Sequence, residues 1–325
     1  MLKIGIIGTG YWGKHYVRIL NNYNNVKLEV ICDKIQENLN KIKIVYPNLN
    51  VTTELNNIFN YNLDAVVVVT PASTHYNIVK LCLNNNLHVL VEKPLTVDVD
   101  EAQELYKLSE EKNRKLMVGH TYLFNSCVEK MKEIINDNSF GKIHSISMER
   151  TNFGPIRNDV NVIWDLATHD ISIILYLLGE IDFSKIEVIG NTVLNDTDNA
   201  YIILKTKNNI IININVSWIS AGKVRRTVIN GEYKKIIFDE MDKNMPLQIY
   251  NSGLIKNINK QQDFTIGSVF MDGDILVPYI NYKEPLTYEV DTWLDAIKNN
   301  TSFKSDGEFG YHVVDILNKI CLKLN

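Results

Sequence analysis

The sequence predicts an α/β protein with a doubly wound parallel sheet first and an α+β domain with a mostly antiparallel sheet second. Over residues 1–120, short runs rich in Val and Ile alternate with helical patterns, which is the order of elements in a doubly wound fold. After Gly119 the pattern changes, and residues 186–239 are mostly strand-like with hairpin signals between the strands. The 325 residues allow roughly two domains at about 150 residues each, so we expect domains at 1–120 and 121–325.

The first domain is expected to contain a buried parallel sheet. Residues 65–69 are apolar without alternation, which is typical of a strand covered by helices on both faces. Asp98 or Asp100 can cap the last helix of this domain, and Glu101 lies in its first turn. The strands are expected at residues 3–7, 28–32, 65–69, 88–91 and 115–119, and the helices at 12–21, 34–45, 74–85 and 100–113.

The second domain is expected to combine helices with an antiparallel sheet. Asn208 and Asn209 separate the strand-like runs 200–207 and 210–218 and form a good hairpin signal. Gly231 marks a second hairpin. The other expected elements are an amphipathic helix at 127–136, a strand at 143–149, a polar loop at 152–161, a helix at 164–178 and closing helices at 285–298 and 310–324.

Composition excludes several classes of protein. The 34 basic and 38 acidic residues give a net charge of -4, without the basic excess of a nucleic-acid binder. No apolar run approaches the ~18–20 residues of a membrane span, and the N-terminus lacks the pattern of a secretory signal. The four cysteines do not have zinc-site spacing. We therefore expect a cytoplasmic protein with no metal, nucleic acid or membrane partner.

Gly8, Gly10 and Gly13 form a GxGxxG pattern that follows the first strand and opens a helix. The first glycine permits a tight turn, the second lets a pyrophosphate approach the backbone, and the third allows close packing of helix and strand. The N–H groups at the start of the helix can then bind phosphates. A glycine turn with a purely structural role is the alternative. The loop residues expected around a dinucleotide are Gly8, Thr9, Gly10, Tyr11, Trp12 and Gly13.

Asp33 ends the second strand, 20 residues after Gly13. An acid at this place binds the ribose hydroxyls of the adenosine in dinucleotide-binding folds. Its negative charge would repel a 2′-phosphate, so it predicts NAD rather than NADP as the cofactor. Lys34 is adjacent and could tolerate the phosphate.

Two more groups of polar residues follow the next predicted strands of the sheet. Thr70, Pro71 and His75 follow one strand, and Glu92 and Lys93 end the next. Loops at the carboxyl ends of such strands line the ligand crevice, so we expect both groups to contact the cofactor. A simple helix start is the alternative for the first group, and a solvated ion pair at a strand end is the alternative for the second.

Asp165 and His169 are four residues apart in the helix expected at 164–178, so they share one helix face. A histidine titrates near neutral pH and can act as a general base. A core histidine held by its own helix is the alternative. Arg150 and Arg157 lie before and on the polar loop and could bind a substrate phosphate, with simple solvent exposure as the alternative.

Taken in order, these motifs resemble those of the Gfo/Idh/MocA family, which contains glucose–fructose oxidoreductase and inositol dehydrogenase. The matching segments are GIIGTGYWG at 5–13, Asp33, TPxxxH at 70–75, EKP at 92–94 and DxxxHD at 165–170. The resemblance implies a Rossmann domain followed by a domain with a large open-faced sheet, and an active site between them. It also implies that Lys93, Asp165 and His169 occupy the catalytic positions. The glycine-rich segment often found before that aspartate is replaced here by residues 161–164.

Two segments, GHTYLFN at 119–125 and NVIWDLATHDISIILYLLG at 161–179, are similar to a branch associated with nucleotide-sugar metabolism. This resemblance implies NAD-dependent oxidation of a secondary hydroxyl, at C3 of a UDP-activated N-acetylhexosamine. His169 would be the base, Lys93 would orient the hydroxyl, and Asp165 would hold the substrate or the imidazole. The alternatives are a ketosugar reductase using NADH or NADPH, an NAD-recycling glycosidase, and a non-catalytic binding protein. The expected substrate contacts are Lys93, Tyr122, Arg157, Asp165 and His169.

The strands of the second domain also suggest self-association. Val216, Trp218 and residues 210–214 provide more apolar surface than one layer of helices can cover. An uncovered apolar face of that size is normally an interface. We expect the open face of the sheet to form it, and the family resemblance implies a homodimer or a homotetramer.

Overall fold

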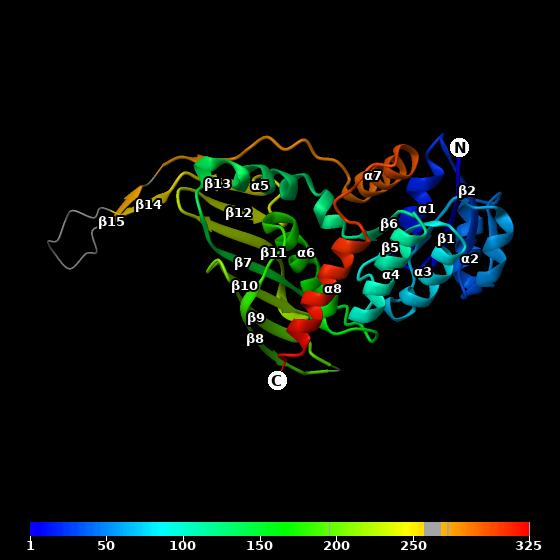
Figure 1. Cartoon of the computed structure of the whole chain (residues 1–325), viewed down its shortest axis with the longest axis horizontal. Coiled ribbons are helices and arrows are strands. Elements are labelled where there is room, and N and C mark those ends of the chain that lie inside the picture. The colour runs from blue at the N-terminus through cyan, green and yellow to red at the C-terminus, as the bar shows by residue number, and fades with distance from the viewer. Residues whose placement is uncertain (195, 257–267, 272, 325) are drawn as a thin grey trace. The chain divides into compact units, whose positions relative to one another are not determined.

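The computed structural model describes residues 1–194, 196–256, 268–271 and 273–324. The chain forms two compact units, and each is built around its own sheet (Figure 1). The first unit contains Met1–Thr121 and Glu284–Asn318, and the second contains Tyr122–Lys283 and Lys319–Asn325.

The first unit contains a six-stranded parallel sheet with the strand order β3-β2-β1-β4-β5-β6. This order reverses direction between β1 and β4, and ligands bind at such a switch point, beyond the carboxyl ends of the strands. The doubly wound prediction is therefore confirmed. The strands are β1 (Leu2–Ile7), β2 (Val26–Cys32), β3 (Asn50–Thr52), β4 (Ala65–Val68), β5 (His88–Glu92) and β6 (Leu116–Gly119).

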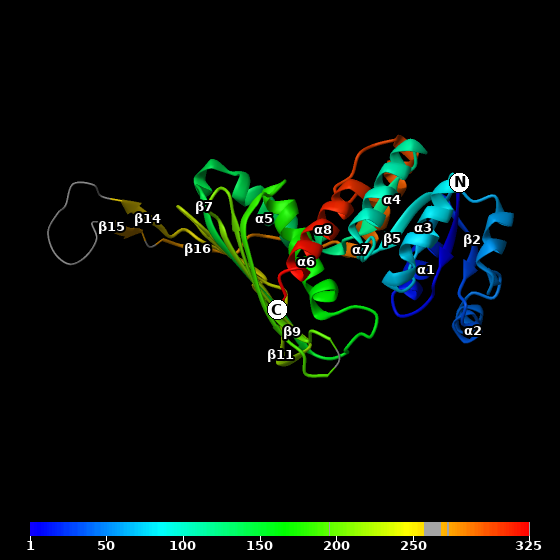
Figure 2. The ribbon, with the colours of Figure 1, turned by 60° about the horizontal axis from the view of Figure 1, so that its bottom comes forward.

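Helices connect the strands as the apolar pattern predicted. All four residues of β4 are buried, as expected for an unbroken apolar run. Asp98 caps α4, and its Oδ1 accepts a 3.0 Å hydrogen bond from Glu101 N. Helices α3 and α4 lie side by side (Figure 1, Figure 2). The connecting helices are α1 (Gly13–Asn21), η1 (Leu55–Tyr61), α2 (Gln36–Val45), η2 (Ala72–Thr74), α3 (His75–Asn84) and α4 (Val99–Glu111).

Helix α7 (Pro285–Asn299) and most of α8 (Gly307–Cys321) belong to the first unit, although we assigned residues 121–325 to the second domain. The chain between these helices joins the edge strand β6, where Val118 N donates to Ser305 O at 2.8 Å. Figure 1 shows α7, in orange, beside α1, in blue. The sequence did not predict that the C-terminal helices belong to the first unit. An amphipathic pattern identifies the apolar face of a helix but not the sheet against which that face is buried.

The second unit contains an eight-stranded sheet with the strand order β16-β13-β12-β11-β7-β10-β9-β8. Its pairs are antiparallel except for β7 and β10, which run parallel. The strands are β7 (Ile143–Phe153), β8 (Phe183–Asn191), β9 (Asn199–Thr206), β10 (Ile211–Ser217), β11 (Ile219–Gly231), β12 (Lys235–Asp239), β13 (Leu247–Tyr250) and β16 (Ile275–Leu276).

The remaining elements of the second unit are short helices and a small hairpin. Both sequence-predicted hairpins are present, because β9 pairs antiparallel with β10 and β11 pairs antiparallel with β12. Asn209, in the first turn, has the positive φ of 64° that its residue type tolerates. The elements are η3 (Thr121–Phe124), α5 (Ser126–Asn136), η4 (Asn138–Phe140), η5 (Ile163–Ala167), α6 (Thr168–Leu178), β14 (Gly253–Lys256) and β15 (Ser268–Met271).

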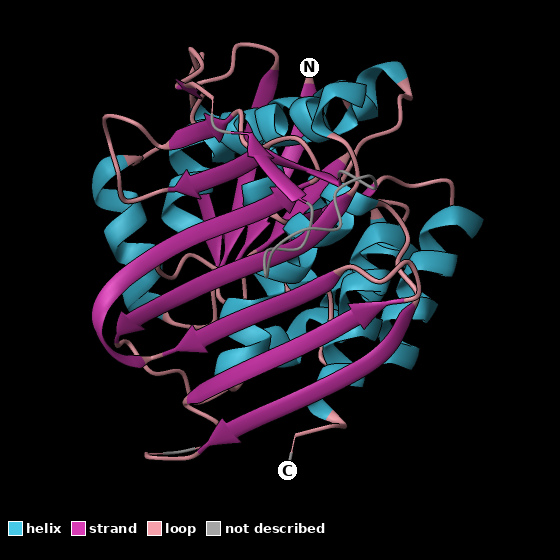
Figure 3. Ribbon diagram, turned by 90° about the vertical axis from the view of Figure 1, so that its left-hand side faces the viewer, coloured by secondary structure: helices cyan, strands magenta, loops and turns pink. Residues whose placement is uncertain are grey.

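The residues that we expected on the uncovered face of the eight-stranded sheet are mostly buried. Most of the residues that we named as exposed are core residues, because side chains alternate between the faces of a strand. The opposite face carries the exposed apolar side chains of Tyr201, Ile203 and Ile211. Figure 3 shows the strands of this sheet broadside. The homodimer or homotetramer stays a prediction. The buried residues, each at most 1% exposed, are Ile212, Ile214, Val216 and Trp218.

Within the ranges given above, no helix is both long and apolar enough to span a membrane. Within the same ranges, no group of three or more His, Cys, Asp or Glu side chains is arranged to hold a metal ion.

Candidate active site

The GxGxxG loop between β1 and α1 has the geometry of a phosphate-binding turn. Gly8 has a φ of +94°, and a Cβ there would lie 2.4 Å from Val69 O. A Cβ on Gly13 would lie 2.2 Å from Gly8 O, so packing inside the protein requires both glycines. A Cβ on Gly10 would meet no described atom within 4 Å, which leaves room for a ligand against the backbone. These residues fit a dinucleotide, whose pyrophosphate they would hold at the start of α1.

Asp33 follows β2 and holds the same loop in place. Its Oδ2 accepts hydrogen bonds from Thr9 N at 2.7 Å and Thr9 Oγ1 at 2.9 Å. Its carboxylate also accepts from Ile35 N at 2.9 Å and Asn38 Nδ2 at 3.1 Å. Burial alone would raise the pKa of Asp33, but these hydrogen bonds outweigh burial and lower it. The carboxylate is therefore ionised, as the predicted contact with the adenine ribose requires.

The other loop residues predicted for the cofactor are mostly exposed. Tyr11 and Trp12 are 73% and 49% exposed, and their rings contact each other edge to face with centroids 5.6 Å apart. Lys34 is also exposed. Large apolar surface of this kind beside a glycine loop can pack against a bound ligand.

His75 joins the two loops that follow β4 and β5. Its Nδ1 lies 2.8 Å from Pro94 O, and its Nε2 lies 2.8 Å from Thr70 O. Because both oxygens are acceptors, the imidazole donates to both only when both nitrogens carry a proton. Thr74 Oγ1 donates to Thr70 Oγ1 at 2.8 Å within the turn that leads into α3. The structure thus gives these residues a role in shaping the loops, and their predicted cofactor contacts stay predictions.

Glu92 and Lys93 lie at the carboxyl end of β5. Glu92 Oε1 accepts a 2.9 Å hydrogen bond from the hydroxyl of Tyr16, and Glu92 Oε2 accepts from Lys93 N at 3.2 Å. His120 follows β6 and is fully buried. Burial, together with the positive charge of Lys93, lowers its pKa to about 3, so His120 is neutral. Tyr16 and His120 were not among the residues predicted from the sequence, although His120 lies in the GHTYLFN segment.

In the second unit, Asp165 and His169 lie at the start of one helical segment. The first turn, η5, is a π-helix that contains Asp165, and α6 follows with His169 near its start. Such π turns are frequent at functional sites. Asp165 Oδ1 accepts from Arg157 NH1 at 3.2 Å, and its Oδ2 accepts from Trp218 Nε1 at 3.1 Å. A loop and the residue that follows β10 therefore fix this carboxylate from two sides.

His169 lies against an aromatic and cationic cluster. The Tyr122 ring is 4.8 Å from the His169 ring, between centroids, at an interplanar angle of 57°. The guanidinium of Arg150 lies 4.3 Å from the centroid of the Tyr122 ring, within the range of a cation–π contact. The Tyr122 hydroxyl donates to Glu240 Oε2 at 2.8 Å. Glu240 is a further residue that no sequence motif indicated.

The two arginines proposed for a substrate phosphate have different surroundings. Arg150 is 4% exposed, and it pairs with Asp170 through NH2 at 2.9 Å and Nε at 3.0 Å. The alternative of solvent exposure is therefore wrong for Arg150, because β7 turns this side chain into the core, and its phosphate role stays a prediction. The Arg157 side chain is 32% exposed and pairs with Asp159 at 2.6 Å and with Asp165.

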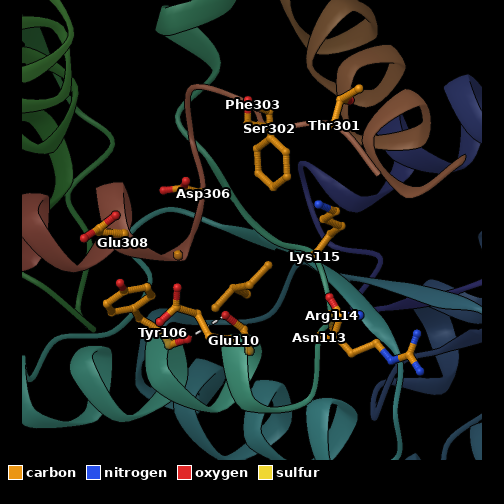
Figure 4. Close-up of a pocket in the computed structure, with 13 residues that line it drawn as sticks. Tyr106, Glu110, Asn113, Arg114, Lys115, Thr301, Ser302, Phe303, Asp306 and Glu308 are labelled. Carbon is orange, nitrogen blue, oxygen red and sulfur yellow. Dashed lines mark hydrogen bonds between the residues drawn. The ribbon is translucent and has the colours of Figure 1, made fainter. Parts of the chain in front are cut away.

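One pocket of the first unit lies away from all these residues. It has a volume of about 340 Å³ and lies between the end of α4, the start of β6 and the chain before α8 (Figure 4). Its wall combines Lys115 with Glu110, Asp306 and Glu308. It adjoins the amino end of β6, whereas the predicted cofactor residues lie at the carboxyl ends of the strands.

Comparison with known proteins identifies the family. Residues 2–120 match a model described as an oxidoreductase family with an NAD-binding Rossmann fold, and residues 128–237 match the GFO/IDH/MocA C-terminal domain. The chain belongs to the Gfo/Idh/MocA family of oxidoreductases. The Rossmann domain of this oxidoreductase binds NAD, as the glycine loop and Asp33 predicted. When bound, NAD supplies the hydride acceptor or donor.

Relatives of this oxidoreductase include enzymes with different substrates. UDP-N-acetylglucosamine 3-dehydrogenase from Acidithiobacillus ferrooxidans is 23% identical over 322 residues, covering 96% of this chain and 94% of that protein. Inositol 2-dehydrogenase from Rhodococcus jostii is 29% identical over 184 residues, covering 55% of this chain and 50% of that protein. The comparisons therefore establish an oxidoreductase and include both substrate classes.

Solved structures support the fold of the whole chain. The UDP-N-acetylglucosamine 3-dehydrogenase GnnA from Acidithiobacillus ferrooxidans has a TM-score of 0.83 at 21% identity, covering 99% of this chain and 97% of that one. The WlbA dehydrogenase from Bordetella pertussis, solved with NADH and UDP-GlcNAcA, has a TM-score of 0.80 at 17% identity, covering 99% and 96%. The predicted fold class is therefore confirmed over both units.

Proposed function

We propose that this oxidoreductase oxidises a secondary hydroxyl of a sugar, at C3 of a UDP-activated N-acetylhexosamine, with NAD as the hydride acceptor. The observation that carries the proposal is the extent of the match. The UDP-N-acetylglucosamine 3-dehydrogenase matches 96% of this chain, including the second unit with Asp165 and His169. The inositol 2-dehydrogenase from Rhodococcus jostii matches 55%. The second unit is the part in which a substrate-specific site would differ.

The reaction removes a hydride from carbon and a proton from the hydroxyl on that carbon. We propose His169 as the general base, a role that typically contributes ~10²–10⁴-fold to the rate. Lys93 is proposed to orient the hydroxyl and to stabilise negative charge that develops on its oxygen. Asp165, fixed by Arg157 and Trp218, is proposed to bind the substrate or to hold the imidazole of His169.

Tyr122 and Arg157 are proposed as substrate-binding residues, although both side chains already contact other residues of the protein. Arg157 already pairs with Asp159 and Asp165, so binding a phosphate would exchange at least one of these contacts. The Tyr122 hydroxyl already donates to Glu240, and Arg150 and His169 lie against its ring. A ligand would therefore contact only the part of the ring that these two side chains leave uncovered. An aromatic face of this kind suits the apolar side of a sugar or a uracil ring.

A panel of substrates tests the proposal. The purified protein is mixed with NAD and with UDP-N-acetylglucosamine, UDP-N-acetylgalactosamine, dTDP- and GDP-sugars, free N-acetylglucosamine or myo-inositol, and NADH formation is followed by its absorbance. We expect the highest kcat/KM with a UDP-N-acetylhexosamine, and a much lower value with free N-acetylglucosamine. A higher kcat/KM with myo-inositol would replace the nucleotide sugar by a cyclitol, as the inositol dehydrogenase relatives would suggest.

Two further outcomes would change the reaction rather than the site. If a 3-ketosugar oxidises NADH while no sugar reduces NAD, the enzyme works as a ketosugar reductase. If a glycosidic bond is cleaved without net NADH formation, NAD is recycled and the enzyme is a glycosidase.

A further inference from the structure

A buried chain of polar side chains crosses the first unit from α7 to β5. The Tyr16 hydroxyl lies 2.9 Å from Glu92 Oε1 and 3.1 Å from Glu289 Oε1. Tyr16 comes from α1, Glu92 from the end of β5 and Glu289 from α7. Tyr16 and Glu289 are both 0% exposed. Glu92 Oε2 in turn accepts from Lys93 N, so the chain ends at the backbone of Lys93.

The protons in this chain can be assigned by counting donors. A tyrosine hydroxyl has one hydrogen, and an ionised carboxylate only accepts hydrogen bonds. Tyr16 can therefore donate to one of its two carboxyl neighbours, and the other must donate to the Tyr16 oxygen. Burial raises the pKa of Tyr16 well above its usual value, so the hydroxyl keeps its hydrogen. One of the two glutamates must consequently be a neutral carboxylic acid.

Burial decides which glutamate carries the proton. Glu289 has no exposed surface, whereas Glu92 lies at a strand end and is only partly buried. An ionised carboxylate away from water is costly unless it is fully paired. The second oxygen of Glu289, Oε2, has no hydrogen-bond partner among the described residues. The groups that face Glu289 are Tyr16, Glu92 and Thr121, and none of these three is a cation.

We propose that Glu289, as a neutral carboxylic acid, is a positioning residue for Lys93. Glu289 donates to Tyr16, Tyr16 donates to Glu92, and Glu92 holds the backbone N–H of Lys93. The proposal rests on the proposed function for the role of Lys93 in the reaction. Burial, followed by the negative charge of Glu92, raises the pKa of Glu289 well above its usual value, which supports the neutral form.

Three variants test whether Glu289 acts as a hydrogen-bond donor or only fills space in the core. Glu289→Gln keeps a donor for the Tyr16 oxygen, whereas Glu289→Met fills similar space without one. Tyr16→Phe removes the central hydroxyl and leaves α7 unchanged. Asp295→Asn is the matched control, because it removes an acid from the exposed face of the same helix. All four proteins are compared with the wild type as NAD complexes.

Two measurements need no substrate. Infrared difference spectra of wild type minus Glu289→Gln should contain the carbonyl stretch of a protonated carboxylic acid at neutral pH. Hydrogen exchange of the peptide that contains the Lys93 amide should accelerate about fivefold in Glu289→Met and Tyr16→Phe, as expected for loss of a hydrogen bond of about 1 kcal/mol. Exchange in Glu289→Gln and Asp295→Asn should stay within about threefold of the wild type.

The activity measurement uses a sugar nucleotide that the wild type oxidises. Glu289→Met should lower kcat about tenfold or more, because misplacement of a catalytic group affects the reaction step. The Kd for NAD should change by less than about threefold, and Glu289→Gln should restore kcat. A missing infrared band, or a Glu289→Gln variant that behaves like Glu289→Met, would overturn the proposal. If the wild type oxidises no sugar nucleotide, the proposed function fails, while the infrared and exchange data still decide the state of Glu289.

Discussion

The cofactor side of the first unit and the cluster around His169 in the second unit are assembled in different ways. In the first unit, the loops after β1, β2, β4 and β5 bring Gly8, Asp33, Thr70 and Lys93 to one edge of a parallel sheet. In the second unit, the neighbours of Asp165 and His169 come from a loop, a strand end and distant segments. The arrangement of the first kind can be predicted from the spacing of residues in the sequence, whereas the contacts of the second kind cannot.

The largest expected effect concerns the ion pair beneath the second cluster. Arg150→Met should leave Asp170 buried without its partner, and breaking a buried pair in this way costs about 3–5 kcal/mol of unfolding free energy. Urea denaturation followed by tryptophan fluorescence measures the loss. The double variant Arg150→Met/Asp170→Leu should regain most of it, because neither charge then remains buried. A loss below about 1 kcal/mol for the single variant would show that the pair contributes as little as an exposed one.

The next effect tests whether the two units contribute to one reaction. Lys93→Ala in the first unit and His169→Ala in the second should each lower kcat/KM about 10²-fold or more, while the Kd for NAD stays close to the wild-type value. Activity of the wild type should also fall on the acidic side as the base becomes protonated. Retention of activity within about tenfold in His169→Ala would remove His169 from the role of base.

His120, in the first unit, should make the stability of the protein sensitive to acid. Its pKa is about 3 in the folded protein and near ~6.5 when unfolded. The unfolded chain therefore binds a proton that the folded chain does not, so stability falls as the pH drops below ~6.5, by roughly 2 kcal/mol at pH 5. The stability of His120→Gln should change less between pH 7 and pH 5. If the unfolding free energies of the variant and the wild type change equally with pH, the buried, neutral state of His120 is contradicted.

The smallest effect concerns the choice between cofactors. Asp33→Ser should weaken NAD binding about tenfold, equivalent to one charge-assisted hydrogen bond, and should reduce the preference for NAD over NADP. Lys34→Ala is the companion variant, since Lys34 is the exposed cation beside the predicted ribose site. Fluorescence titration with both cofactors measures the ratio of Kd values. Tighter binding of NADP than NAD by the wild type would show that a cation such as Lys34 governs this end of the site.

Several features of the fold were predicted correctly because they depend on local sequence. The unbroken apolar run of β4, the cap at Asp98 and the hairpin at Asn208 and Asn209 each follow from the chemistry of a few neighbouring residues. The order of the motifs along the chain also indicated the family. The short strand β3 was missed because three residues do not establish a periodic pattern.

The misplaced residues share a different cause. Arg150, Val216 and Trp218 were each assigned an exposed role, but strand alternation in the sheet turned them into the core. The alternation is visible in the sequence, whereas the face that helices cover is not. The same limit applies to α7 and α8, whose apolar faces pack in the first unit.

The sequence by itself determined the two-part α/β architecture, the NAD-binding loop with Asp33, and the family, because glycine spacing and the alternation of strands and helices are local properties. Only the tertiary structure decided that Arg157 and Trp218 hold Asp165, that Asp170 neutralises Arg150, and that Glu289 meets Tyr16 and Glu92 from helix α7. These contacts join residues up to 273 positions apart. They depend on which faces of sheet and helix are buried together. Because the hydrophobic effect is non-directional, the sequence of one segment does not specify the segment against which it packs.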